Sequence, residues 1–296
     1  MNNVLEVKGL CKDYARVVKK PEANEFALKN VTFNMPKGYI MGFIGPNGAG
    51  KTTVIKLILG IKKPDAGAIS LFGQDIAKKM QNDRIGMVLD FPHFPDEWTL
   101  LEVEKALKPF YQAWDTAYYA WLLKKFGLSP NKKVKALSRG MQVKLQIAIA
   151  LSHHAQLLIL DEPTSGLDPV ARDEVCELLQ EFVEDGERSV LFSTHITSDL
   201  EKVADYATMI LDGEIRFTGT KDDLLEKYMR ITGGRDDIDA AQKEKIIGFR
   251  KHGAGFEGLL DVADMADMPA SVLMEAPTLE EIIVFMNKGA ALHGEA

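Results

Sequence analysis

One glycine-rich stretch carries a lysine and two threonines and could hold phosphate groups. It fits the pattern G-x-x-x-x-G-K-[ST] and consists of Gly45, Pro46, Asn47, Gly48, Ala49, Gly50, Lys51, Thr52 and Thr53. The glycines let backbone N–H groups close around an anion, and a helix that starts here adds the partial positive charge of its N-terminus. Lys51 is expected to reach the β- and γ-phosphates, and Thr52 to ligate Mg²⁺. The stretch predicts a site for a nucleoside triphosphate.

Carboxylates and a histidine follow other apolar runs. The run 157–160 lacks alternation, which predicts a strand buried on both faces that delivers Asp161 and Glu162 at its carboxyl end. Asp90 and His195 end two further apolar runs. Ligands of open α/β sheets bind at that edge, so these side chains could serve phosphoryl transfer. A strand that simply ends in acidic residues to meet solvent, and a structural histidine, are the alternatives.

The elements that must position these residues alternate between strands and helices. The run 39–44 predicts a buried strand before the phosphate loop, and 54–59 predicts a helix after it that ends at Gly60. Strands are also expected at 3–9 and 27–35, separated by a polar loop. The pattern predicts an α/β fold.

A helical segment interrupts that pattern. Thr99 and Glu102 form a capping box, which predicts a helix with apolar positions Leu100, Val103, Leu107, Phe110 and Trp114. Asp115 could cap a second helix, and a third is expected to end at Ser152. We interpret about 99–153 as an inserted helical subdomain. Its many aromatic residues fit either core packing or a partner surface.

Composition narrows the classes of function. The length of 296 residues suits one large domain or one and a half. The 36 Lys plus Arg and 43 Asp plus Glu give a net charge of −7, so nucleic acid is not an expected partner. Two cysteines without C-x-x-C spacing indicate a reduced protein. We found neither a basic-then-apolar leader nor a run of ~18 apolar residues, so the chain is not expected to cross a membrane by itself.

The motifs occur in an order that resembles the ATP-binding subunits of ATP-binding cassette (ABC) transporters over about residues 3–222. The order is the phosphate loop, Leu137-Ser138-Arg139-Gly140-Met141-Gln142, Leu157-Leu158-Ile159-Leu160-Asp161-Glu162, Ser165-Gly166-Leu167-Asp168 and His195. The resemblance implies a P-loop NTPase (RecA-like) core with an antiparallel β subdomain and an inserted α-helical subdomain. Residues 1–222 would be this domain, and 223–296 a small C-terminal α+β extension that either dimerises, regulates or buttresses the core.

The resemblance also implies roles for single residues. Tyr14 looks like the adenine-stacking aromatic, Asp161 like the Mg²⁺-associated carboxylate, Glu162 like the base for the attacking water, and His195 like the switch that senses the γ-phosphate. Ser138 and Gly140 look like the signature that contacts ATP held by the opposite subunit, and Asp168 lies in the loop that connects the two sites.

Three positions depart from the usual family pattern. Arg139 replaces the signature's first glycine, Asp90 stands where the lid glutamine that contacts metal and water is usual, and 16–25 lengthens the adenine-side loop. None removes an indispensable phosphate ligand.

The segment 91–98, with its two prolines and three aromatics, suits the wall of a groove for a permease helix.

The function implied is that of an ATP-hydrolysing motor subunit that uses ATP and Mg²⁺, pairs head-to-tail with a second copy, and binds a polytopic permease at the cytoplasmic face of the membrane. Within the family the chain looks most like bacterial peptide-export ATPases, including the phenol-soluble modulin exporters of staphylococci. The alternative is a soluble ABC-type ATPase acting on ribosomes or DNA. Proteins of that kind resemble either two cassettes in one chain or one cassette split by a long coiled coil, and this sequence shows neither pattern. A GTPase switch would need Asn-Lys-x-Asp, and the nearest stretch ends in Val134.

Overall fold

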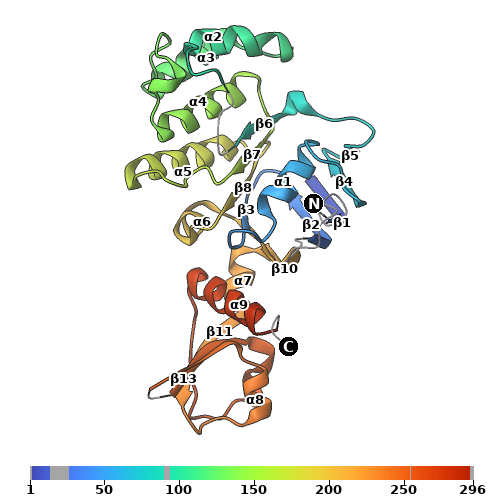
Figure 1. Ribbon diagram of the computed structural model, residues 1–296, viewed down its shortest axis with the longest axis vertical. Coiled ribbons are helices and arrows are strands. Elements are labelled where there is room, and N and C mark those ends of the chain that lie inside the picture. Colours follow the sequence, from blue (N-terminus) through green and yellow to red (C-terminus); the bar gives the residue numbers. More distant parts are fainter. Residues whose placement is uncertain (1, 14–26, 90–93, 254, 294–296) are drawn as a thin grey trace, which may run out of the picture.

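The computed structural model describes residues 2–13, 27–89, 94–253 and 255–293, with the backbone alone from 288 onward. Tyr14, the loop 16–25 and Asp90 therefore lie outside the described residues. Within them, the chain forms a central body with a helical part at one end and a small sheet at the other (Figure 1).

A six-stranded sheet forms the middle of the molecule. Its strands, in spatial order, are β10 (Glu214–Thr220), β9 (Tyr206–Leu211), β3 (Ile40–Ile44), β8 (Ser189–Thr194), β7 (Leu157–Asp161) and β6 (Ile85–Val88). All neighbours run parallel except β10, which pairs antiparallel with β9. The carboxyl ends of β3, β7 and β8 consequently meet at one edge, with Asp161 paired to Ser193 and Ile44 to Thr194.

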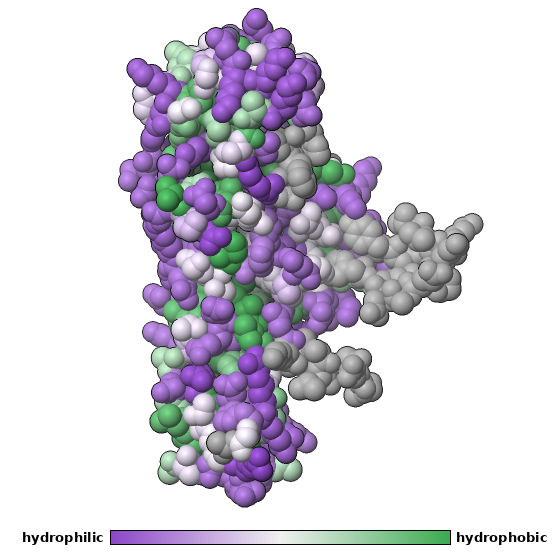
Figure 2. Space-filling model, turned by 60° about the vertical axis from the view of Figure 1, so that its left-hand side comes forward, coloured by the Kyte–Doolittle hydropathy of each residue, from purple (hydrophilic) through white to green (hydrophobic). Residues whose placement is uncertain are grey.

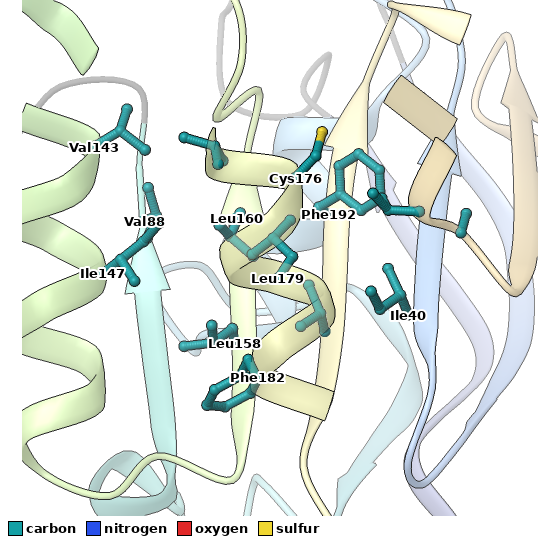
Figure 3. Close-up of a cluster of buried hydrophobic side chains, with 14 of the residues drawn as sticks. Ile40, Val88, Val143, Ile147, Leu158, Leu160, Cys176, Leu179, Phe182 and Phe192 are labelled. Atoms are coloured by element: carbon teal, nitrogen blue, oxygen red, sulfur yellow. The ribbon is translucent and has the colours of Figure 1, made fainter. Parts of the chain in front are cut away.

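Both faces of this sheet are covered, as the uninterrupted apolar strands predict. On β3, Ile40 and Ile44 belong to one core cluster, whereas Met41 and Phe43 belong to the other. Figure 3 shows the first cluster, in which two helices pack over the strands. The helices on that face are α4 (Arg139–Ser152), α5 (Pro169–Val183) and α6 (Thr197–Val203).

The opposite face packs on α1 (Lys51–Ile58) and on an antiparallel sheet. That sheet has the order β2-β1-β4-β5, with β1 (Asn3–Asp13), β2 (Ala27–Pro36), β4 (Ala66–Leu71) and β5 (Gln74–Asp75). A 3₁₀ turn, η1 (Asn82–Arg84), then leads into β6.

The helical insertion begins as predicted but its first helix is shorter. Thr99 Oγ1 accepts from Glu102 N–H at 3.3 Å, and Glu102 Oε2 accepts from Thr99 N–H at 2.7 Å, which completes the capping box. The expected continuation through Phe110 is wrong, because Pro109 has no N–H to extend the helix. Phe110 is 76% exposed. The elements are α2 (Leu100–Leu107), η2 (Lys108–Phe110), α3 (Thr116–Lys125) and η3 (Val134–Ala136), followed by α4.

Some aromatic residues of the insertion are buried in its core, and others lie at the surface. Tyr119 is fully buried and its hydroxyl donates to the Leu100 carbonyl at 3.0 Å. Tyr111 stacks on His153 at the end of α4, with ring centroids 4.1 Å apart. Trp121, in contrast, is 52% exposed. Core packing therefore explains part of the set and leaves a few apolar side chains at the surface.

The C-terminal part has its own antiparallel sheet, of order β12-β13-β11-β14. Leu279, Ile282 and Phe285 of α9 share a core cluster with Leu200 and Val203 of α6, so α9 packs the small sheet against the central body. This contact supports a buttressing role. The elements are α7 (Lys221–Lys227), β11 (Tyr228–Gly234), α8 (Ala240–Glu244), β12 (Ile247–His252), β13 (Gly255–Asp261), η4 (Val262–Asp267), β14 (Leu273–Glu275) and α9 (Leu279–His293).

The face of the molecule shown in Figure 2 is largely hydrophilic. In Figure 2, apolar side chains form small separate spots among polar ones on the face shown. Of the helices in the described ranges, none has both the length and the apolar composition that crossing a membrane requires.

Candidate active site

The phosphate loop connects β3 to α1 and leaves an open cradle. Gly48 and Gly50 have φ values of +86° and +113°, in a region that favours glycine. Gly50 is the N-cap of α1 and carries no side chain, so none caps the first-turn N–H groups of this helix. A Cβ at Gly48 would have no atom within 4 Å. Uncapped helix N–H groups beside open space suit a phosphate.

Lys51 is held at the mouth of this loop. Its side chain is only 5% exposed, and Nζ donates to the carbonyls of Gly45 at 2.7 Å and Pro46 at 3.2 Å. The same Nζ lies 3.1 Å from Glu162 Oε1, an ion pair outside hydrogen-bond geometry. The ammonium group therefore sits between the loop and the carboxylate at the end of β7.

Thr52 and Asp161 meet at the start of α1. Thr52 Oγ1 donates to Asp161 Oδ2 at 2.8 Å, and Ser193 Oγ donates to Asp161 Oδ1 at 2.7 Å. A hydroxyl and a carboxylate are ligands that Mg²⁺ prefers, and Mg²⁺ bound to nucleotide needs only one or two protein groups. Within the described ranges no group of three or more His, Cys, Asp or Glu could hold a metal. The donors thus fit Mg²⁺ that accompanies a triphosphate better than a protein-only metal centre.

Glu162 lies directly beyond β7 in a constrained backbone conformation. Its φ is +51°, which is uncommon for a residue with a side chain. Its N–H contacts both the carbonyl oxygen and Oγ of Ser193, each at 3.1 Å. Its Oε2 is 2.7 Å from His195 Nδ1, so the carboxylate stands between Lys51 and His195. The sheet therefore brings together Lys51, Thr52, Asp161, Glu162 and His195, as expected for residues at the carboxyl ends of parallel strands.

The remaining predicted site residues lie at the starts of α4 and α5. Ser138 is exposed and caps α4 by accepting from Met141 N–H at 3.4 Å. Asp168 caps α5 by accepting from Val170 and Ala171 N–H, both at 3.0 Å. A Cβ on Gly140 would lie 3.3 Å from Ala171 Cβ. Ser138, Gly140 and Asp168 thus form a second group on the α4–α5 side of the chain.

Ser193 is a site residue that was not predicted from the sequence. This fully buried hydroxyl contacts Asp161 and the Glu162 backbone at once. A polar residue just before Thr194 and His195, at the end of an apolar run, is the signal that could have identified it. The pairing of β7 with β8 was also required to see its partners.

Comparisons with known proteins match this chain to a family of nucleotide-binding proteins. The sequence model of the ABC transporter family matches residues 28–165. The chain is 34% identical over 200 residues to the lantibiotic transport ATP-binding protein SrtF of Streptococcus pyogenes, covering 67% of this chain and 86% of that protein. It is 32% identical over 250 residues to the Nod factor export ATP-binding protein I of Burkholderia orbicola, covering 80% and 81% respectively.

A solved ATP-binding cassette shares the fold. This dimer, in a post-hydrolysis state bound to ADP and Pi, is 25% identical with a TM-score of 0.64, over 73% of this chain and 98% of that one. Fold and site together define a P-loop ATPase with an ATP-binding cassette. The chain belongs to the ABC transporter ATP-binding family, and it binds and hydrolyses ATP. The predicted fold class and enzyme activity are confirmed.

Proposed function

We propose that this chain is the motor subunit of a membrane exporter, whose cargo is a peptide or another amphipathic or antimicrobial compound. It acts as a head-to-tail dimer, bound through a separate permease to the cytoplasmic face of the membrane. Relatives named for lantibiotic transport, bacitracin transport and Nod factor export support an export role. A place among the phenol-soluble modulin exporters is the narrowest form of this proposal.

The position of Glu162 between Lys51 and His195 carries the motor part of the proposal, which is ATP hydrolysis. ATP phosphates would take the N–H groups of the loop and the Lys51 ammonium, and this exchange frees Glu162 from its ion pair. Glu162 then accepts the proton of the attacking water, while His195 orients that water and the γ-phosphate. Mg²⁺ supplies charge neutralisation on the phosphates, and Thr52, Asp161 and, outside the described residues, Asp90 would hold it.

The second group of residues would complete the site of the other subunit. Ser138 and Gly140 present the N-terminus of α4, whose partial positive charge suits the ATP of the opposite subunit. Asp168 would connect the two sites, and Tyr14 would stack on the adenine. Each dimer then has two composite ATP sites.

Size-exclusion chromatography of Glu162→Gln tests this proposal. The amide still hydrogen-bonds water but cannot accept its proton, so ATP stays bound and joins two chains, while turnover falls by ~10²–10⁴. Glu184→Gln, at the end of α5, is the control and should keep wild-type turnover without a lasting dimer. Wild-type turnover by Glu162→Gln would remove Glu162 from the mechanism.

A further inference from the structure

Arg139, which replaces the usual signature glycine, links the start of α4 to the 165–168 loop of the same chain. It is the first residue of α4, and its Nε donates to the Ser165 carbonyl at 2.8 Å. The side chain also lies across Gly166, because a Cβ there would be 3.6 Å from Arg139 Cδ and 3.7 Å from Nε. Gly166 has a φ of +73°, so a larger residue would also be strained. Arg139 thus extends from the signature over the turn that follows Glu162.

That turn is directly connected to Glu162. The N–H of Ser165 donates to the Glu162 carbonyl at 3.2 Å, so Ser165 contacts Arg139 through its carbonyl and Glu162 through its amide. Glu162 has a φ of +51°, a conformation that persists only where neighbouring groups hold it. Arg139 therefore supports, from one side, the turn on which this conformation depends.

The start of α4 and the 165–168 loop approach each other closely. At Gly140, a Cβ would be 3.3 Å from Ala171 Cβ and 3.7 Å from Leu167 Cδ2. Leu167 is buried, and the next residue, Asp168, caps α5 with two hydrogen bonds. A displacement of the first turn of α4 would therefore reach the 165–168 loop through the Arg139–Ser165 hydrogen bond and the close approach of Gly140 to Leu167.

We propose that Arg139 is a positioning residue that links the two ATP sites of the dimer. When Ser138 engages the nucleotide of the opposite subunit, Arg139 transmits the resulting position of α4 through Ser165 to Glu162 of its own site. This inference rests on the proposed head-to-tail dimer. It differs from direct contact between Arg139 and the opposite ATP, because the effect appears at the base on Arg139's own chain.

Mixed dimers separate these two effects. One copy keeps the native Glu162 and hydrolyses ATP, while a differently tagged copy carries Glu162→Gln, binds ATP and holds the dimer together. Arg139→Ala is placed in either copy. In the native copy it should lower kcat by about tenfold with KM for ATP unchanged, since misplacement of a reacting group acts on the chemical step. In the Glu162→Gln copy it should have little effect.

Two further variants control for folding and packing. Lys144 of α4 pairs with Glu174 of α5, outside the 165–168 loop, so Lys144→Ala in the native copy should leave kcat unchanged. Arg139→Lys, which keeps a donor on a long side chain, should restore most of the rate. An unchanged kcat with Arg139→Ala in the native copy would overturn the inference, whatever the other placement does. Failure of Glu162→Gln to dimerise with ATP would instead refute the proposed dimer.

Discussion

Lys51 and Glu162 neutralise each other, with Nζ 3.1 Å from Oε1, while the other Glu162 oxygen is 2.7 Å from His195 Nδ1. The expected phosphate ligand and the expected base are therefore partners of one another. A triphosphate carries more negative charge than one carboxylate and competes for the same ammonium. The exchange would couple ATP binding to release of the base.

Lys51→Met should weaken ATP binding without unfolding the chain. Hydrogen bonds to charged groups contribute about 1.5–3 kcal/mol, so we expect an increase in Kd of at least about tenfold. Lys56→Met, in the last turn of α1, should bind as wild type does. Isothermal titration calorimetry measures both. Equal affinities for the two variants would contradict a phosphate-binding role for Lys51.

Much of this site could be predicted because its signals are local. The phosphate loop is a contiguous motif, and the apolar run before Asp161 and Glu162 predicts a buried strand whose carboxyl end carries ligands. The capping box at Thr99 and Glu102 formed as predicted for the same reason, since its partners are three residues apart.

The remaining features depend on contacts between distant segments or on a competing local effect. Ser193 gains its role only because β8 lies beside β7, and no local pattern specifies that pairing. Arg139 reaches Ser165 across 26 residues of sequence. Phe110 continued the apolar helical spacing, but Pro109 ended the helix first.

Ser193→Ala should reduce catalysis as well as stability. The hydroxyl fixes one oxygen of Asp161 and contacts the N–H of Glu162, so its loss leaves both carboxylates less constrained. We expect kcat to fall about tenfold, with KM for ATP changed less. Steady-state kinetics at saturating Mg²⁺ measures the two parameters.

Ser189 provides a matched control on the same strand. It is also fully buried, but its hydroxyl accepts from Gly38 N–H at 2.8 Å, far from the carboxylates. Ser189→Ala and Ser193→Ala should each lose about 1–3 kcal/mol of unfolding free energy, and only the latter should lose activity. Equal kcat values at equal stability would show that Ser193 contributes to folding alone.

Ser138→Asp tests whether the signature acts on the neighbouring subunit. Aspartate caps helices as well as serine does, so the thermal midpoint should stay within about 2 °C of wild type. Its charge would repel the ATP of the opposite subunit, which should abolish hydrolysis while ATP still binds to the monomer. Ser138→Asn, a neutral cap of similar size, should retain part of the activity.

Complementation adds a second readout for Ser138. Mixing Ser138→Asp with Lys51→Ala chains gives dimers in which one composite site keeps both a native phosphate loop and a native signature. Activity should then return to one site per dimer. Dimers that form but remain inactive would argue against head-to-tail sharing of the sites.

Leu101 is a sharper probe of permease docking than Trp98. The Trp98 side chain is half-buried and packs against the main core, so Trp98→Ala should destabilise the insertion itself. Leu101 is 39% exposed in the first turn of α2. Leu101→Asp places a carboxylate at a helix N-terminus, where it favours the fold.

Docking near the start of α2 predicts that Leu101→Asp weakens assembly with the permease by ~2 kcal/mol, about 30-fold, if Leu101 is a buried anchor in the complex. The basal ATPase rate of the isolated subunit should not change. Phe110→Asp alters a more exposed apolar residue of the same insertion and should leave assembly intact. Pull-down of the permease that co-purifies with the tagged wild-type chain, alongside ATPase rates, compares the two. Equal recovery with both variants, or a loss with Phe110→Asp alone, would place the docking surface elsewhere on the insertion or outside it.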